Sequence, residues 1–207
     1  MANIFIDLGA NKGQSVRDFR LGTTPNGDRI DFNNWRVYCF EPNPKLFPKL
    51  EAALEEERRQ SPLGTFEFIP AGAGTVDGAF PFFEGIRSDA SGTFSANRRK
   101  RAAPCHRWPN GSGPVLAEVG IDLPVIDFPK WLRENITDDD YIVLKCDIEG
   151  AEHDLMRALT EKGLVQRIAQ FYCEWHTASM VPPISRREVN LFIKRLRELG
   201  VEVLPWR

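Results

Sequence analysis

The sequence has no long run of apolar residues and no strong excess of either charge. Its 27 basic and 29 acidic residues leave a formal net charge of −2 over 207 residues. This balance gives no long-range attraction to nucleic acid or to an anionic membrane. No segment reaches the roughly 20 apolar residues of a membrane helix, and the N-terminus lacks the charged and apolar blocks of a signal peptide. We therefore expect a soluble, cytoplasmic protein with neither a membrane nor a nucleic-acid partner.

Cysteines are few, and none of them is arranged as a C-x-x-C pair. Of the four, Cys39, Cys146 and Cys173 lie in apolar, strand-like runs, whereas Cys105 does not. Zinc sites and disulfide frameworks need paired spacing or a secretory context. We therefore expect reduced, buried thiols.

The dinucleotide fingerprint G-x-G-x-x-G is also missing. In its place, the apolar run Ile4 to Ile6 is followed by Asp7 to Gly13, which reads D-x-G-x-x-x-G, and then by a helical pattern. Glycines at Gly9 and Gly13 let the backbone come close to a small ligand. An acid beside free N–H groups suits a ligand that carries an amine and a carboxylate. The turn predicts a cofactor loop, although taken alone it fits the simple end of a strand equally well.

Strand patterns alternate with helix patterns along most of the chain, with no internal repeat. The predicted strands are Asn3 to Asp7, Arg36 to Phe40, Thr65 to Ile69, Ala79 to Phe83, Val119 to Ile126, Tyr141 to Cys146, Arg167 to Cys173 and Val201 to Leu204. The predicted helices are Gly13 to Phe19, Lys45 to Gln60, Asp127 to Asn135, a helix through Leu155 and Leu159, and Ser185 to Leu199. This alternation predicts an α/β fold with a doubly wound, mostly parallel sheet between two helical layers, in one domain over residues 1–207.

Polar or small residues stand at the ends of several predicted strands. They are Asp7, Glu41, the small-residue turn at Pro70 to Gly74 with Ala71 and Gly72, Asp147, and Glu174 to His176. The carboxyl ends of parallel strands share one edge of the sheet, where such folds bind ligands. This edge is the predicted site.

The acids at this edge each have a structural and a functional interpretation. Glu41 follows the second strand, where a carboxylate can accept hydrogen bonds from two ribose hydroxyls or can cap the next helix. Capping also explains one or two of Asp147, Glu149 and Glu152. Capping gives no reason for an acid at the end of a buried strand, so we expect Asp147 to have a role in binding or catalysis.

The segment from Glu84 to Gly120 is irregular and rich in Ser, Gly, Pro and Arg. A segment of this length in a compact domain is typical of a functional lid or of disorder. It contains the basic run Arg98 to Arg101, which is either an ordinary solvated surface or a binding site for an anionic group of a substrate.

Three segments of the sequence resemble the signature segments of the FkbM family of S-adenosylmethionine-dependent methyltransferases. They are Phe5 to Gly13 (FIDLGANKG), Phe40 to Pro44 (FEPNP) and Leu144 to Glu152 (LKCDIEGAE). The resemblance spans Asn3 to about His176 and implies a Rossmann-like class I methyltransferase fold. Such folds usually have an antiparallel seventh strand, for which this sequence leaves little room after Val201 to Leu204.

The resemblance also implies roles for individual residues. Asp7, Gly9, Asn11 and Gly13 would hold the methionine part of S-adenosylmethionine, and Glu41 would hold its ribose. Ala71 and Gly72 would border the adenine, and Asp147 would lie near the reactive methyl group. The expected partner is a small-molecule or sugar-like acceptor that is methylated on a hydroxyl.

A hydroxyl acceptor needs a general base. We expect this base to be His176 or Asp147, with Glu174 beside them, although a histidine at this position also fits a purely structural role. We assign no metal ligand. In an alternative mechanism, Asp147, Glu149, Glu174 and His176 gather Mg²⁺ or Mn²⁺, which lowers the pKa of the acceptor.

Two other classes of protein share some of these features. A nicotinamide oxidoreductase has a similar fold and an acid such as Glu41, but it needs the missing three-glycine fingerprint. A non-catalytic module could bind the cofactor or use the basic run to hold an anionic partner. Cofactor binding without turnover would favour this module.

Overall fold

The computed structural model describes residues 1–82, 121–176 and 184–206. The predicted lid at residues 84–120, with the basic run Arg98 to Arg101 and Cys105, lies outside the described residues.

A six-stranded sheet forms the centre of the molecule, in the order β3-β2-β1-β7-β8-β9. Its strands are β1 (Asn3–Leu8), β2 (Trp35–Phe40), β3 (Thr65–Ile69), β7 (Tyr141–Cys146), β8 (Ile168–Cys173) and β9 (Glu202–Pro205). All pairings are parallel, which confirms the predicted mostly parallel α/β sheet. The terminal strand β9 pairs directly with β8, and within the described residues no antiparallel strand joins this sheet.

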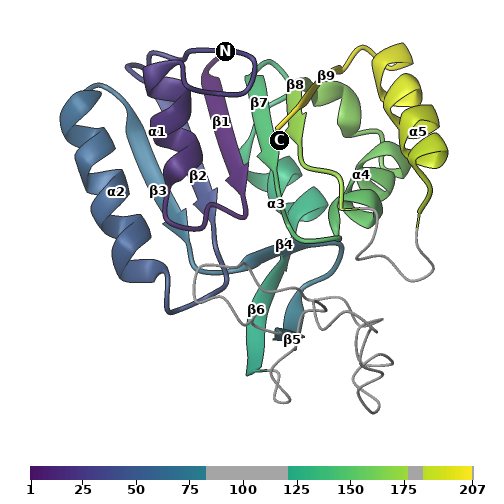
Figure 1. Cartoon of the computed structure of the whole chain (residues 1–207), viewed down its shortest axis with the longest axis horizontal. Coiled ribbons are helices and arrows are strands. Elements are labelled where there is room, and N and C mark those ends of the chain that lie inside the picture. The colour runs from purple at the N-terminus through teal and green to yellow at the C-terminus, as the bar shows by residue number, and fades with distance from the viewer. Residues whose placement is uncertain (83–120, 177–183, 207) are drawn as a thin grey trace, which may run out of the picture.

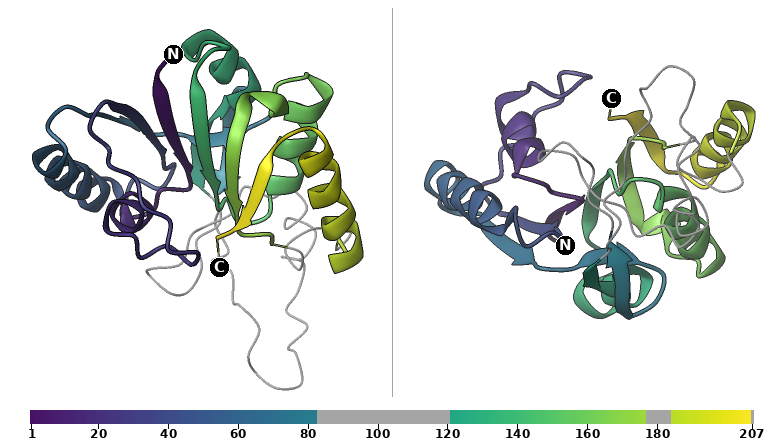
Figure 2. Two further views of the ribbon diagram at one scale, coloured as in Figure 1. Left: turned by 90° about the horizontal axis from the view of Figure 1, so that it is seen from above. Right: turned by 60° about the horizontal axis from the view of Figure 1, so that its bottom comes forward.

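Helices cover both faces of the sheet, because successive side chains of each strand point to opposite sides. The helices are α1 (Gln14–Leu21), α2 (Phe47–Gln60), α3 (Phe128–Asn135), α4 (Glu152–Glu161) and α5 (Arg186–Glu198), with a 3-10 turn at Val165–Arg167. From β1, Phe5 packs with α1 and α2 in one core, whereas Ile4 and Ile6 pack with α3, α4 and α5 in the other. Figure 2 gives two further views of these layers.

The predicted helix starts at Asp127 and Ser185 are confirmed. Asp127 is the N-cap of α3 and accepts from the N–H of Lys130. Ser185 opens α5 with a full capping box to Glu188. No helix in the described part of the chain combines the length and the apolarity that crossing a membrane requires.

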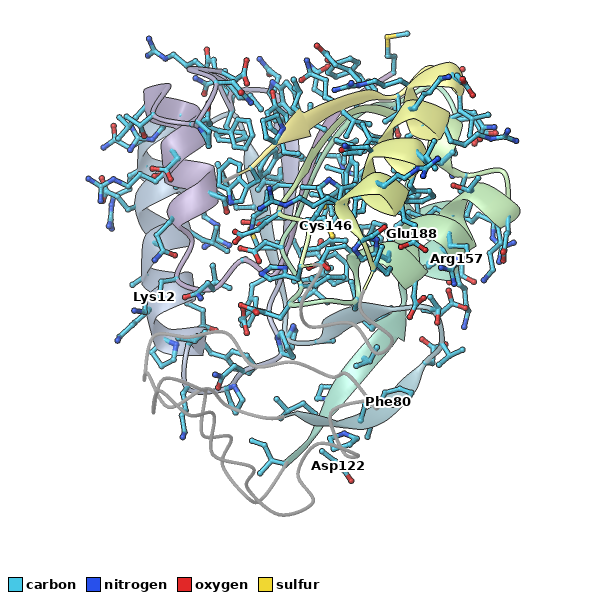
Figure 3. The ribbon with its side chains drawn as sticks, turned by 45° about the vertical axis from the view of Figure 1, so that its right-hand side comes forward. Lys12, Phe80, Asp122, Cys146, Arg157 and Glu188 are labelled. Carbon is cyan, nitrogen blue, oxygen red and sulfur yellow. The ribbon has the colours of Figure 1, made fainter. Side chains whose placement is uncertain are left out.

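A second, three-stranded sheet lies at the end of the main sheet to which the strand arrows point (Figure 1). It consists of β4 (Gly72–Gly74), β6 (Ile121–Asp127) and β5 (Gly78–Phe82), in the order β4-β6-β5. Figure 3 shows Phe80 and Asp122 on this small sheet, away from Cys146 at the end of β7.

The small sheet corrects the prediction of a plain turn at Pro70 to Gly74, because Gly72–Gly74 is a strand that pairs in parallel with β6. Small residues are needed here, since a Cβ added at Gly74 would lie 2.5 Å from Cγ1 of Val125. The glycine-rich segment therefore forms a strand because β6 lies close enough to pair with it.

Two glycines with the same backbone conformation allow a test of the loop after β1. Gly9 has φ +78° and Gly27 has φ +75°. A Cβ at Gly9 would lie 1.9 Å from the carbonyl oxygen of Asp147, whereas a Cβ at Gly27 would meet nothing within 4 Å. We predict that Gly27→Ala costs only the left-handed strain of about 1–2 kcal/mol, and that Gly9→Ala costs clearly more. Urea unfolding of both variants measures the difference, and equal losses would contradict the close contact.

Candidate functional site

The carboxyl ends of the central strands bring the predicted acids to one edge. Asp7 is the residue before last of β1, and Glu41, Asp147 and Glu174 directly follow β2, β7 and β8. Because these strands are parallel and adjacent, their ends meet at the same edge (Figure 1). The sequence prediction of a shared edge is confirmed.

The loop after β1 is held by backbone hydrogen bonds to β2 and by close packing on α2. The N–H groups of Gly9 and Ala10 both donate to the carbonyl of Phe40, at 3.1 and 2.9 Å. Asn11 adopts a left-handed φ of 54°. Gly13, with φ +81°, packs so tightly on α2 that an added Cβ would lie 2.9 Å from the Cβ of Ala53. Each glycine of the loop therefore serves close packing as well as turning.

Glu41 closes the loop on the β2 side. Its Oε2 accepts from the N–H of Asn11 at 2.8 Å, and its Oε1 accepts from the N–H of Asn43 at 2.9 Å. Burial raises the pKa of Glu41 to about 7, although the two backbone hydrogen bonds act in the opposite direction. A carboxylate has about four lone-pair sites, so each oxygen can still accept one hydrogen bond from a ligand.

A buried ion pair lies beneath the loop. Asp7 and Lys145 stand directly opposite each other on β1 and β7, and their charged atoms are 3.0 Å apart. Their side chains are 0% and 4% exposed. Lys145 also donates to the carbonyl of Gly9 at 2.9 Å, and Ser15 donates to the other oxygen of Asp7. Asp7 is thus enclosed by Lys145 and Ser15, and this geometry lets it position the loop.

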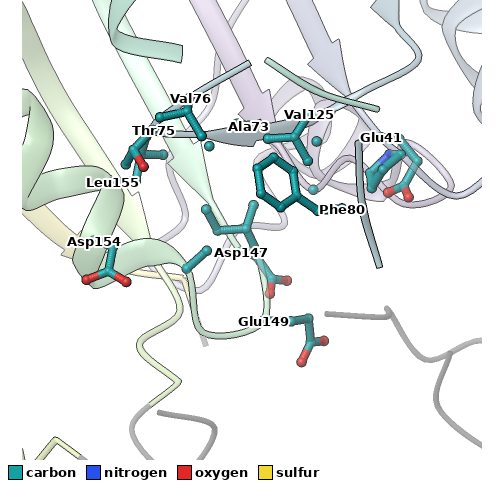
Figure 4. A pocket seen from close by; sticks show the side chains of 16 residues that line it. Glu41, Ala73, Thr75, Val76, Phe80, Val125, Asp147, Glu149, Asp154 and Leu155 are labelled. Atoms are coloured by element: carbon teal, nitrogen blue, oxygen red, sulfur yellow. The ribbon is translucent and has the colours of Figure 1, made fainter. Parts of the chain in front are cut away.

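A cavity opens between the loop, the end of β7 and the small sheet (Figure 4). Its polar side is formed by Gly9, Glu41, Asp147 and Glu149, with Gly72 next to them. Thr75 and Asp154 also line it, and the apolar side chains that line it are Pro42, Ala73, Val76, Phe80, Val125, Ile148, Ala151 and Leu155. Figure 4 shows the ring of Phe80 projecting into this space. A flat, largely apolar group next to a polar one would fit between these two sides.

His176 stands at the centre of the acids that follow β7 and β8. Its Nδ1 lies 2.9 Å from Oε1 of Glu152. Its Nε2 lies 3.6 Å from Glu149, 3.7 Å from Glu174 and 3.9 Å from Asp147. Burial lowers the pKa of His176, but the hydrogen bond that it donates to Glu152 and the surrounding carboxylates raise it by more, to about 9.

Glu152 is fully buried and shapes the turn that carries Asp147 and Glu149. Its carboxylate accepts from the N–H groups of Ile148 and Gly150, at 3.0 to 3.1 Å. Glu149 within this turn has a left-handed φ of 57°. Glu152, the first residue of α4, therefore satisfies backbone donors of the turn that precedes the helix, while the N-cap Ala151 receives no side-chain cap.

The predicted site residues do not all lie in the cavity. Gly9, Glu41, Gly72 and Asp147 line it. Asn11 contributes a backbone N–H to Glu41, Gly13 packs against α2, and Asp7 is fully buried in β1. Ala71, Glu174 and His176 do not line the cavity; His176 lies 3.9 Å from Asp147 and 3.7 Å from Glu174. The roles of all these residues in binding or catalysis remain predictions.

Two functional candidates escaped the sequence analysis. The sequence analysis treated Lys145 only as part of a buried apolar strand. A lysine in such a run requires a buried acid as partner, and this requirement was the missed signal. Glu152 was read only as one of several acids near a helix start. No sequence pattern indicated that Phe80 would line the cavity, because its position depends on the pairing of β5 with β6.

A parallel α/β sheet with a glycine loop and a strand-end acid at one edge is typical of proteins that bind nucleotide-like cofactors. Within this class, the chain belongs to the FkbM methyltransferase family, because residues 7–196 match the family model described as Methyltransferase FkbM domain.

Comparison with solved structures finds a similarity to the crystal structure of methyltransferase FkbM from Methylobacillus flagellatus KT, with 18% sequence identity and a TM-score of 0.41. The similarity covers 78% of this chain and 31% of that one, so this chain spans well under half of the solved protein. Comparison with curated proteins finds no match.

The buried pair provides a test of how the loop is held. We predict that Lys145→Met lowers the free energy of unfolding by about 3–5 kcal/mol, because it leaves Asp7 charged and unpaired in the interior. Adding Asp7→Asn should recover part of this loss. The exposed pair of Lys130 and Asp77 is the control, for which Lys130→Met should have a much smaller effect. Equal effects of Lys145→Met and Lys130→Met in urea unfolding would contradict the role of the buried pair.

Proposed function

We propose that this protein transfers a methyl group from S-adenosylmethionine to a hydroxyl oxygen of a small or sugar-like acceptor. Membership of the FkbM methyltransferase family supports the reaction class. The observation that carries the choice of cofactor is the cavity, in which Gly9 and the half-satisfied carboxylate of Glu41 face an apolar wall.

Each part of the cofactor has a matching part of this cavity. The two free lone-pair sites of Glu41 accept the ribose hydroxyls. The adenine ring lies on the apolar side next to Gly72, where Phe80 and Val125 offer flat contact area. The methionine end runs along the loop at Gly9, towards Asp147.

Asp7 serves this site indirectly. Through Lys145, which donates to the carbonyl of Gly9, it fixes the direction of the loop backbone. The methionine group therefore meets the loop backbone and not the carboxylate of Asp7.

Methyl transfer requires one bond to form as another breaks. The acceptor oxygen attacks the methyl carbon in line with the C–S bond, S-adenosylhomocysteine leaves, and the hydroxyl proton passes to a base. Asp147 is the better placed base, because it lines the cavity and His176 does not. Positioning of the two reactants supplies much of the rate, up to roughly 7–11 kcal/mol.

Calorimetric titration with S-adenosylhomocysteine tests the cofactor assignment. We predict micromolar binding to the wild type and a Kd about 10- to 100-fold higher for Glu41→Gln, because one acceptor is replaced by a donor. The control is Glu67→Gln, which changes an exposed acid on β3 and should leave the Kd unchanged.

Absence of binding to the wild type, or equal binding by Glu41→Gln, would refute the assignment. Binding without methyl transfer to any hydroxyl acceptor would favour the non-catalytic module.

The raised pKa of Glu41 predicts a pH dependence of cofactor binding. The ionised carboxylate accepts both ribose hydroxyls, whereas the protonated form loses an acceptor. Since the pKa of Glu41 is about 7, the Kd for S-adenosylhomocysteine should rise as the pH falls from 8 through about 7 to 6. Glu41→Gln should show no such rise. A flat profile of the wild type over this range would count against the ribose role of Glu41.

A further inference from the structure

The aromatic ring of Phe80 lies over the backbone of Gly78, two residues earlier on β5. A Cβ added at Gly78 would have Cε2, Cζ and Cδ2 of this ring as its three nearest neighbours, at 2.9, 3.3 and 3.7 Å. Carbon atoms that are not bonded to each other pack at roughly 3.5–4.0 Å. The ring therefore occupies a position that only a glycine at residue 78 leaves open.

The direction in which this ring leans determines what forms the wall of the cavity. Residues two apart on a strand share a face, and β5 pairs with β6 so that Gly78 stands opposite Val125 and Phe80 opposite Leu123. A ring that leans back over Gly78 is directed towards Val125. Phe80 and Val125 both line the cavity (Figure 4), whereas Leu123 does not. The empty space at Gly78 thus lets the two side chains form one wall.

The backbone at Gly78 is held in place on two sides. On one side it belongs to the antiparallel pairing of β5 with β6. On the other side, Asp77 accepts from the N–H of Asp127 at 2.9 Å and from Nζ of Lys130 at 3.2 Å, which ties it to the start of α3. Gly78 does not line the cavity but Phe80 does, so the ring lies between this backbone and the cavity. A methyl group at residue 78 would therefore push the ring into the cavity.

The backbone conformation of Gly78 does not itself require glycine. Gly78 is not among the glycines with a positive φ, and the three nearest neighbours of an added Cβ all belong to Phe80. A glycine inside a strand destabilises the strand relative to alanine, and an aromatic ring that covers the glycine offsets part of this loss. What glycine provides at this position is the location of the ring.

We propose that Gly78 is a positioning residue for cofactor binding, which keeps the ring of Phe80 far enough out of the cavity for the adenine of S-adenosylmethionine to lie against it. The inference rests on the proposed binding of this cofactor. Flat rings pack against each other within a narrow range of distances, with centroids about 4.5–7 Å apart. Ile148 and Leu155 line the same cavity from the end of β7 and from α4. A ring displaced towards them narrows the space for the adenine.

A double-mutant cycle tests this role. S-adenosylhomocysteine is titrated calorimetrically into the wild type, Gly78→Ala, Phe80→Ala and the double variant. We expect Gly78→Ala to raise the Kd about 3- to 10-fold. In the Phe80→Ala background, Gly78→Ala should change the Kd no further, because it acts only through the ring. The matched control is Ala79→Ser, which adds one atom to the opposite, exposed face of the same strand and should leave the Kd unchanged.

Urea unfolding separates this role from a purely structural one. Alanine is a better strand residue than glycine, and the displaced ring moves into open space. The midpoint of unfolding of Gly78→Ala should therefore be no lower than that of the wild type, although the variant binds the cofactor more weakly. A fall in the midpoint that accompanies the loss of affinity would overturn the inference.

Equal Kd values for the wild type and Gly78→Ala would also overturn it, and so would a rise in Kd that persists in the Phe80→Ala background. In each of these cases the wild type still binds S-adenosylhomocysteine, so the proposed cofactor stands. Absence of binding to the wild type removes the proposed cofactor, and the role of Gly78 falls with it.

Discussion

The ion pair between Asp7 and Lys145 is the interaction on which the rest of the site depends. It joins β1 to β7 beneath the loop, and Lys145 also holds the carbonyl of Gly9. Above it, Gly9 packs so closely against the carbonyl of Asp147 that no larger residue fits. Two buried charges are costly unless they are paired, so this pair fixes one register of the two strands and thereby the distance between the loop and Asp147.

A second layer of acids extends from this pair to the cavity. Glu41 uses backbone donors on the β2 side and keeps acceptor capacity for a ligand. Glu152 does the same for the turn on the β7 side and orients His176. In both cases a carboxylate accepts hydrogen bonds from the backbone of a loop. The remaining lone pairs of Glu41, and the neighbours Asp147 and Glu149 of Glu152, then face the cavity. This arrangement combines the structural and functional interpretations that the sequence left open.

Sequence patterns were sufficient to predict the six strands of the main sheet, the helix starts at Asp127 and Ser185, and the shared edge of strand ends. It was not sufficient for β4, because Gly72–Gly74 carries no apolar pattern and becomes a strand only through β6. Nor did it reveal the partner of Lys145, because Asp7 is distant in sequence and meets it only through the pairing of β1 with β7. Nor did it indicate that Asp7, expected to hold the methionine part of the cofactor, is fully buried next to Lys145.

A crystal structure of the protein with S-adenosylhomocysteine tests the central claim most directly. The account predicts that the ribose hydroxyls contact Glu41, that the adenine lies against Phe80 and Gly72, and that the sulfur points towards Asp147. A ligand bound elsewhere, for example in the groove lined by Trp175, Lys194 and Arg197, or a ribose out of reach of Glu41, would contradict the account.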